Sequence, residues 1–264
     1  MTGVAYLSLL QQFLIIGCLL TAIRLFHGGL HKRYPVFFAY MLFRIPNSLW
    51  PLNFDFRSNS YFYLYVCTLP LVLIFYILSV RELYRLVLED YRGLQTVGRW
   101  AMYGSLAVSV FIAIATLLSN IKPTQQRSKV LGLILGSERA VDTTLALFII
   151  ILLALLSRYP IRLSRNVRGH AVIYSIFFFA GILGLLARSV LGLRNVDTWN
   201  VVGLVLNVLC VLSWFILFSP AGEAGAASPL KAAAGVRTEN EKRLLLQLET
   251  LNATLLRLSR AKIG

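Results

Sequence analysis

The sequence predicts an all-α fold, a bundle of seven transmembrane helices with the N-terminus outside, the C-terminus inside and a short cytoplasmic helix at the C-terminal end. Three observations carry this prediction. Hydrophobic residues make up 58% of the 264 positions and charged residues only 14%, which is more apolar surface than one soluble core of this size can bury. The apolar residues gather in long runs separated by polar joints. The basic residues cluster in those joints, as they do in multi-pass membrane proteins.

Seven apolar stretches are long enough to be spans, since a helix needs roughly 20 residues to cross about 30 Å of hydrocarbon. They are residues 5–23, 35–52, 61–80, 100–119, 138–157, 170–188 and 199–218. The second is the weakest, because Arg44, Pro46 and Asn47 interrupt it. If it dipped into the bilayer and returned, the basic joints that follow would face outward, so a true span is the better interpretation.

Positive charges are distributed unevenly between the two sets of joints that connect the spans. The joints richer in Lys and Arg are residues 24–34, 81–99 and 158–169. The joints poorer in Lys and Arg are residues 53–60, 120–137 and 189–198. The C-terminal tail is also basic and falls on the richer side. Because basic loops remain in the cytoplasm, this pattern predicts an N-out, C-in topology.

Two further features fit this threading. Trp50, Trp100 and Trp199 fall at predicted span ends, where indole rings prefer the headgroup region. The first span has no positive residue ahead of it, and Arg24 follows it directly. It is therefore predicted to be an uncleaved anchor and not a signal peptide.

After the seventh span the long apolar runs end, and a stretch of small residues is followed by a charged segment with regularly spaced leucines. The predicted domains are a membrane domain at 1–218, a flexible linker or frayed helix at 219–236 and a cytoplasmic helix at 237–264. Leucines in the last segment follow a 4,3,4,3 spacing that places one seam along a helix. The seam consists of Leu244, Leu248, Leu251, Leu255 and Leu258. It predicts a coiled coil with a second copy or a partner helix, and the alternative is an amphipathic helix on the inner leaflet.

Arg44 is the least expected residue of the predicted spans. It lies about 10 residues from the inner boundary, hence about 15 Å deep, where a lone cation is costly. We expect it to face the bundle interior, with Asp142 of the fifth span as the first candidate acceptor. The predicted intramembrane polar cluster consists of Arg44, Asn47, Glu138, Asp142 and Asn207. It is either a structural pair or a ligand or ion site, and outward snorkelling of Arg44 is the remaining alternative.

Three histidines map to the inner ends of the first and sixth spans. His27 and His31 are four residues apart, and His170 opens the sixth span. A shared metal or haem site would need a continuous helix through Gly28 and Gly29, where a helix break is more typical. We therefore expect interfacial histidines, no metal site and no cofactor.

Several activities find no support in the sequence. All six lysines lie outside the predicted spans, which argues against the retinal Schiff base of an opsin. No hydrolase, zinc-protease, phosphate-loop or dinucleotide motif is present, and no catalytic residue is predicted. The net charge of +15 does not indicate nucleic acid, because the basic residues form short clusters between apolar runs. Cys18, Cys67 and Cys210 each lie inside an apolar run and are expected to be small buried hydrophobes.

Three stretches carry a resemblance to a known group of proteins. They are KRYPVFFAY at 32–40, VRELYRLVLEDYRGL at 80–94 and LSRNVRG at 163–169. In these stretches the chain resembles a family of uncharacterised bacterial seven-span, multi-pass membrane proteins. The resemblance covers most of the membrane part and implies the architecture, but no activity. The expected location is a bacterial inner membrane.

The leading functional hypothesis is a non-enzymatic signalling or scaffold module whose bundle is coupled to the cytoplasmic tail. The alternative is a small-solute or ion transporter that uses the region of Arg44 and Asp142, and an intramembrane enzyme comes third. Transporters often contain inverted repeats and helices broken near the midplane. The sequence has no convincing repeat, and only Pro46 and Pro70 offer breaks. The expected partners are the lipid bilayer, a tail partner and a small molecule of unknown identity.

Overall fold

All regular secondary structure in the described residues is helical. The computed structural model describes residues 2–53, 58–89, 140–152, 163–191 and 196–224, with isolated residues and short pieces between 94 and 137, at 154 and between 246 and 254. Over these residues the regular structure contains helices and no strand, so the all-α fold class is confirmed.

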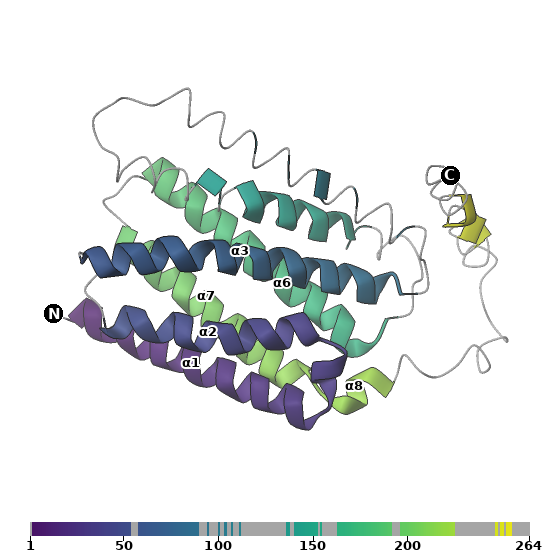
Figure 1. Ribbon diagram of the computed structural model, residues 1–264, viewed down its shortest axis with the longest axis horizontal. Coiled ribbons are helices and arrows are strands. Elements are labelled where there is room, and N and C mark those ends of the chain that lie inside the picture. The colour runs from purple at the N-terminus through teal and green to yellow at the C-terminus, as the bar shows by residue number, and fades with distance from the viewer. Residues whose placement is uncertain are drawn as a thin grey trace.

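The long helices pack lengthwise into one bundle. They are α1 (Thr2–His27), α2 (Pro35–Asn53), α3 (Asn59–Val87), α6 (Arg165–Leu191) and α7 (Val196–Leu217), joined by the 3-10 turn η1 (Leu30–Lys32) and the short α8 (Pro220–Ala224). A further helix covers Ala140–Leu152. α1 packs on α2 and α7, α6 packs on α7, and α3 lies against α2 and α6. Figure 1 shows the N-terminus at one end of the bundle and α8 beside the α1–α2 turn at the other, here called the α8 end.

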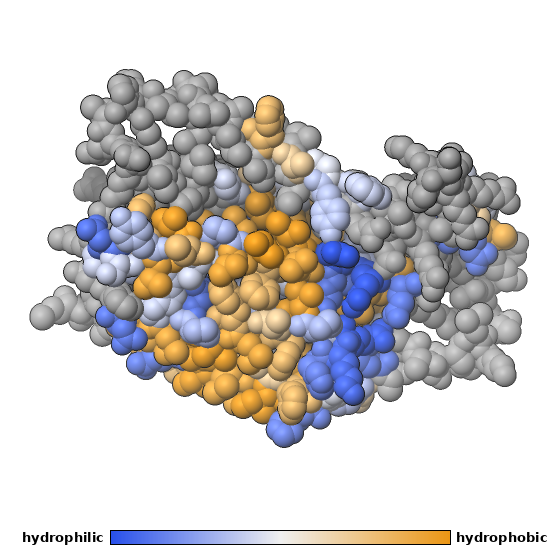
Figure 2. Space-filling model, viewed as in Figure 1, coloured by the Kyte–Doolittle hydropathy of each residue, from blue (hydrophilic) through white to orange (hydrophobic). Residues whose placement is uncertain are grey.

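Three helices are long and apolar enough to cross a membrane, namely Tyr6–His27, Asn59–Val87 and Arg165–Gly184. They coincide with the predicted first, third and sixth spans, and the shorter apolar helices Ala140–Leu152 and Val201–Leu217 coincide with the fifth and seventh. α2 coincides with the second predicted span, whereas most of residues 100–119 lie outside the described residues. Figure 2 shows apolar residues across the middle of the visible face and hydrophilic residues toward both ends. This distribution suits a membrane protein.

The turn between α1 and α2 is set by its glycines. α1 ends at His27, and Gly29 has φ 67°, a left-handed conformation that other residues rarely adopt. The helix break predicted at this point is confirmed. α2 then begins at Pro35, whose missing N–H costs nothing in the first turn. The Glu82 carboxylate of α3 accepts hydrogen bonds from the backbone N–H groups of Val36 (3.0 Å) and Phe37 (2.9 Å), so α3 caps the start of α2.

Aromatic side chains fill the bundle interior toward the α8 end. The aromatic core consists of Tyr34, Phe37, His170, Tyr174, Trp214 and Phe218, each at most 1% exposed. Most of its ring pairs meet edge to face, with Trp214 centred 4.9 Å from Phe37 and 5.1 Å from Tyr174. Such arrangements stabilise beyond the area that they bury. The aromatic core joins α2, α6 and α7 at this end.

Candidate functional site

Arg44 lies on α2 and points into the bundle. Its side chain is buried, with the residue 8% exposed. Nη1 donates a hydrogen bond to the Tyr40 hydroxyl (2.8 Å), and Nη2 donates to Oδ1 of Asn207 on α7 (2.7 Å). The guanidinium also lies over the rings of Tyr40 (5.6 Å) and Phe177 (5.7 Å). The predicted inward orientation of Arg44 is therefore present, and snorkelling toward solvent is not.

Asn207 is held in the orientation that Arg44 needs. Its Nδ2 donates to the carbonyl of Gly203 one helical turn earlier (2.9 Å), which leaves Oδ1 to accept from Arg44. Tyr40 is four residues before Arg44 on the same face of α2. Sequence reasoning missed Tyr40, although this i, i+4 spacing was a usable signal.

The other members of the predicted polar cluster, apart from Asn207, are Asp142, Asn47 and Glu138. Asp142 is buried on the helix Ala140–Leu152, and a Cβ atom added at Gly181 of α6 would lie 3.5 Å from its Oδ2. Among the described residues, the hydrogen bonds of Arg44 go to Tyr40 and Asn207, and Asp142 is not one of its ion-pair partners. Oδ1 of Asn47 accepts from Nε1 of Trp50 (3.2 Å). Glu138 lies outside the described residues.

A pocket of about 240 Å³ opens between α1, α2 and α3, with Arg44 among its lining residues. Its polar lining also includes Gln11, Asn47, Ser48 and Thr68. Rings form much of the rest, from Tyr40, Phe43, Trp50, Tyr61, Tyr65 and Tyr76. Arg44 is the one charged residue in this described lining. We call this space the Arg44 pocket. It lies in the half of the bundle opposite the α8 end, and it would accept a ligand smaller than a typical drug-sized molecule.

Edge-on and tilted ring contacts separate the Arg44 pocket from the α8 end. Tyr76 on α3 contacts Tyr40 (5.7 Å) and Phe177 (5.4 Å), and Phe177 in turn lies 6.1 Å from Trp214 of the aromatic core. Tyr40 and Trp214 are at most 2% exposed. In the described helices, the pocket is therefore closed toward the α8 end by packed side chains.

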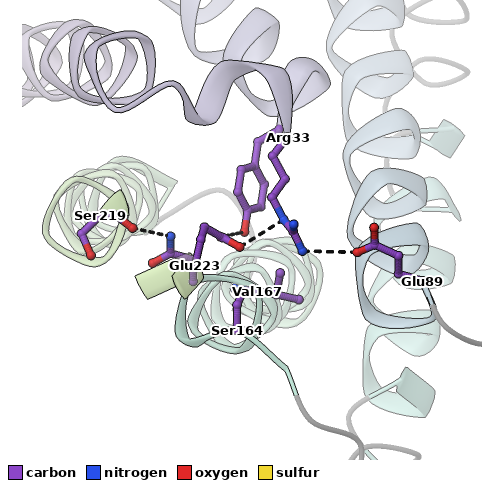
Figure 3. A network of polar contacts seen from close by, with 8 residues as sticks. Arg33, Glu89, Ser164, Val167, Ser219 and Glu223 are labelled. Atoms are coloured by element: carbon purple, nitrogen blue, oxygen red, sulfur yellow. Dashed lines mark hydrogen bonds and ion pairs between the residues drawn. The ribbon is translucent and has the colours of Figure 1, made fainter. Parts of the chain in front are cut away.

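A second polar group lies at the α8 end and ties α8 to the bundle. The Tyr34 hydroxyl donates to Oε1 of Glu223 (2.5 Å), and Nε of Arg33 forms an ion pair with Oε2 of the same carboxylate (3.1 Å). Arg33 also reaches Glu89 (3.2 Å). Figure 3 shows Arg33, Glu89 and Glu223 converging from the η1–α2 turn, the end of α3 and α8. We call Arg33, Tyr34, Glu89 and Glu223 the tail-root network, because the chain continues from α8 into the tail.

Burial affects the protonation of Tyr34 and the strength of the ion pairs in the tail-root network. It raises the pKa of the Tyr34 phenol above its ordinary value, and the hydrogen bond and negative charge of Glu223 raise it further. Tyr34 therefore stays a neutral donor at every physiological pH. The Arg33–Glu89 pair is largely exposed and contributes little, whereas Glu223 is only 15% exposed and its contacts are better protected from solvent. The first residues of the predicted 219–236 linker thus form a helix that docks on the bundle.

The histidines and cysteines only partly follow the sequence-based expectation. His170 is fully buried in the aromatic core and is not interfacial, because α6 begins at Arg165 and carries it one turn into the bundle. His31 stacks on Phe26 (5.1 Å). Among the described residues, no three His, Cys, Asp or Glu side chains gather at metal-binding distance. Cys18 and Cys210 are buried as expected, but Cys67 is exposed on α3.

The predicted leucine seam falls outside the described residues. One neighbouring contact is visible, in which Oδ1 of Asn252 accepts from the backbone N–H of Leu94 (3.4 Å). The Leu94 carbonyl accepts from the Tyr84 hydroxyl near the end of α3 (3.3 Å). The tail segment therefore has a contact with the bundle at the α8 end, and its self-association stays a prediction.

No protein-family model, curated protein or solved structure matches the chain, so its function is inferred from the geometry of its own residues.

Proposed function

We propose that the protein is a non-enzymatic, seven-span signalling module that binds a small organic carboxylate in the Arg44 pocket and is coupled to a cytoplasmic helical tail. The observation that carries this proposal is the buried guanidinium of Arg44, which borders a polar-lined pocket with no described carboxylate against it. The proposed setting is a bacterial inner membrane, with the pocket toward the outside and the tail in the cytoplasm.

The charge of Arg44 is the reason to propose an anionic ligand. A buried cation needs a counter-charge, and neutral acceptors such as Tyr40 and Asn207 supply only part of the lost hydration. Arg presents five N–H donors in a planar fork, of which two are used in the contacts described above. A carboxylate can accept two parallel hydrogen bonds from such a fork, and the low local polarity strengthens them. The rings of Trp50, Tyr61 and Tyr65 offer an apolar wall for the rest of a small ligand.

Transport is the second candidate, and two observations favour signalling over it. α2 continues unbroken through Pro46, and α3 continues unbroken through Pro70. Transporters typically place substrate at helices that are interrupted near the midplane. The rings of Tyr76, Phe177 and Trp214 also fill the route from the pocket toward the α8 end.

The contacts between the two polar groups support coupling to the tail. Arg44 lies over Phe177, Phe177 contacts Trp214, and Trp214 belongs to the aromatic core that also contains Tyr34. Tyr34 holds Glu223 of α8. Contiguous packing of this kind can transmit a displacement if its parts have two arrangements. A ligand that moves Arg44 would therefore act on side chains in direct contact with the root of the tail.

The topology gives the first prediction. In a background without native cysteines, membrane-impermeant thiol labelling of intact cells should modify Gln125→Cys but not Arg165→Cys or Asn240→Cys, because the joint 158–169 and the tail are on the basic, inner side. Labelling after lysis, which should reach all three, is the control for reactivity. Labelling of Arg165→Cys from outside would reverse the proposed orientation.

The ligand proposal is tested by thermal unfolding of the purified protein with small carboxylates and with the corresponding neutral amides. A ligand that binds only the folded state stabilises it by about 2.7 kcal/mol at 100 times its Kd. We expect the melting temperature to rise with carboxylates and not with their amides. Equal effects of the two series, or none from either, would contradict the anion site.

A further inference from the structure

We propose that a groove between α6 and α7, at the α8 end of the bundle, binds one anionic phospholipid. The groove is open and measures about 860 Å³. It is separate from the Arg44 pocket, and it depends only on the part of the proposed function that places the protein in a membrane. Its lining divides into a basic end and an apolar end.

The basic end of the groove consists of Arg165 and Arg168 in the first turn of α6, with Ser219 facing them from the α7–α8 junction. Both arginines are exposed, and neither forms an ion pair with a described carboxylate. Ser164 caps this helix end by accepting from the backbone N–H of Val167 (3.2 Å). Two guanidinium groups without an ion-pair partner among the described residues make this end of α6 a suitable place for a phosphate group.

The apolar end of the groove follows the same face of α6. Val172 is exposed one turn after Arg168, and Ile216 is exposed across from it on α7. Ile176 and Leu212 continue these two exposed rows along the helices, away from the basic end. An acyl chain lying between the two rows would contact the apolar side chains of both rows at once. The groove thus has a basic end for the headgroup phosphate of a phospholipid and an apolar end for its acyl chain.

Gly169 gives the groove its shape. A Cβ atom added there would lie 2.5 Å from Cδ1 of Leu217, so a larger residue would require the Leu217 side chain to move. Gly222 has the same role at α8, where an added Cβ atom would clash with the side chain of Asn166. The Asn166 amide donates to the Ser219 carbonyl (2.8 Å) and fixes this junction. Close packing at Gly169 and Gly222 therefore forms the floor of the groove, and Arg165 and Arg168 lie beside it.

Charge complementarity decides between an anionic lipid and other occupants. Two cations without a described carboxylate beside them favour a net negative headgroup over a zwitterionic one, whose own ammonium would be placed near them. A soluble phosphate would use only the basic end and would leave Val172 and Ile216 uncovered. A phospholipid uses both ends, so the groove fits phosphatidylglycerol better than phosphatidylcholine or free glycerol phosphate.

The test counts bound lipid by native mass spectrometry of the full chain in a non-ionic detergent. Phosphatidylglycerol should bind with a lower apparent Kd than phosphatidylcholine. The double variant Arg165→Gln/Arg168→Gln should weaken phosphatidylglycerol binding by about 20- to 30-fold, because each basic residue near an anionic headgroup contributes about 1 kcal/mol. The matched control Lys32→Gln/Arg81→Gln removes the same charge near the same end of the bundle, outside the groove, and should leave binding unchanged.

A steric variant keeps the test decisive if the arginine variant does not fold. Val172→Trp retains both arginines but fills the apolar end, so it should weaken binding of phosphatidylglycerol while leaving the charge at the rim intact. Glycerol phosphate should not displace the lipid. Equal binding of the two lipids, equal losses in the arginine and control variants, or displacement by glycerol phosphate would each overturn the proposal.

Discussion

Arg44→Met should abolish the rise in melting temperature that a small carboxylate gives the wild-type protein. Removing one partner of a desolvated charge pair typically costs about 2 to 5 kcal/mol of binding, which is about 30- to 5,000-fold in affinity. The ligand-free protein should change much less, by about 1 kcal/mol, because the lost hydrogen bonds to Tyr40 and Asn207 are offset by the removal of a buried charge. The measurement is thermal unfolding with and without the carboxylate.

Two companion variants separate charge from geometry at this site. Arg44→Lys keeps the charge but loses the planar fork, so it should retain only part of the affinity. Asn207→Asp places a carboxylate where Oδ1 now accepts from Arg44 at 2.7 Å. This internal anion should compete with the ligand and weaken its binding while Arg44 remains in place. Partial binding by Arg44→Lys would then measure the contribution of the fork geometry, and weaker binding by Asn207→Asp would measure that of the counter-charge.

The opposite pattern would identify Arg44 as a structural residue. In that case Arg44→Met would lower the melting temperature strongly without ligand, and no carboxylate would raise that of the wild type. Asn207→Asp would then raise stability, because an internal ion pair would replace a neutral contact. The ligand-free melting temperature of Arg44→Met and the response of the wild type to carboxylates therefore distinguish the two roles.

Much of the fold could be predicted because bilayer thickness and helix rise are fixed quantities. Apolar runs of the required length identified the helices later seen as α1, α3 and α6, and the glycines after His27 indicated where α1 ends. Helix α8 lies in the stretch for which the sequence left a flexible linker and a frayed helix open, since small residues and proline are typical of linkers and its five residues carry no apolar period. Its place depends on Tyr34 and Arg33, which are far from it in sequence.

The candidate site was predictable in part. A cation deep in an apolar run must find acceptors, which placed Arg44 inside the bundle with Asn207 among its candidate partners. Its negative charge made Asp142 the first candidate acceptor, ahead of Asn207. A hydrogen bond of Arg44 goes instead to Asn207, because α7 lies opposite Arg44. Sequence spacing gives the faces of one helix and not the rotation of two helices about each other. For the same reason, the pocket between α1, α2 and α3 could not be foreseen.

Trp214→Ala should give the largest loss of stability, about 3 kcal/mol. Trp214 is fully buried and contacts rings from α2 and α6, so its removal leaves a cavity at the centre of the aromatic core. The expected value is at the lower end of the range for buried Trp→Ala changes, because helices in lipid associate through packing and not through transfer from water. Trp100 is 69% exposed, so Trp100→Ala should cost about 0.5 kcal/mol or less.

Trp214→Phe tests the cause of that loss. Among the described residues, the indole Nε1 of Trp214 is buried without a hydrogen-bond partner. Replacement by Phe therefore removes an unsatisfied N–H group along with some volume, and the two effects should nearly cancel. Because Trp214 does not line the Arg44 pocket, neither Trp214 variant should abolish carboxylate binding when the folded protein is assayed below its melting temperature. A large loss in Trp214→Phe would show that the indole N–H has a partner, and a loss of binding would place the aromatic core within the ligand site.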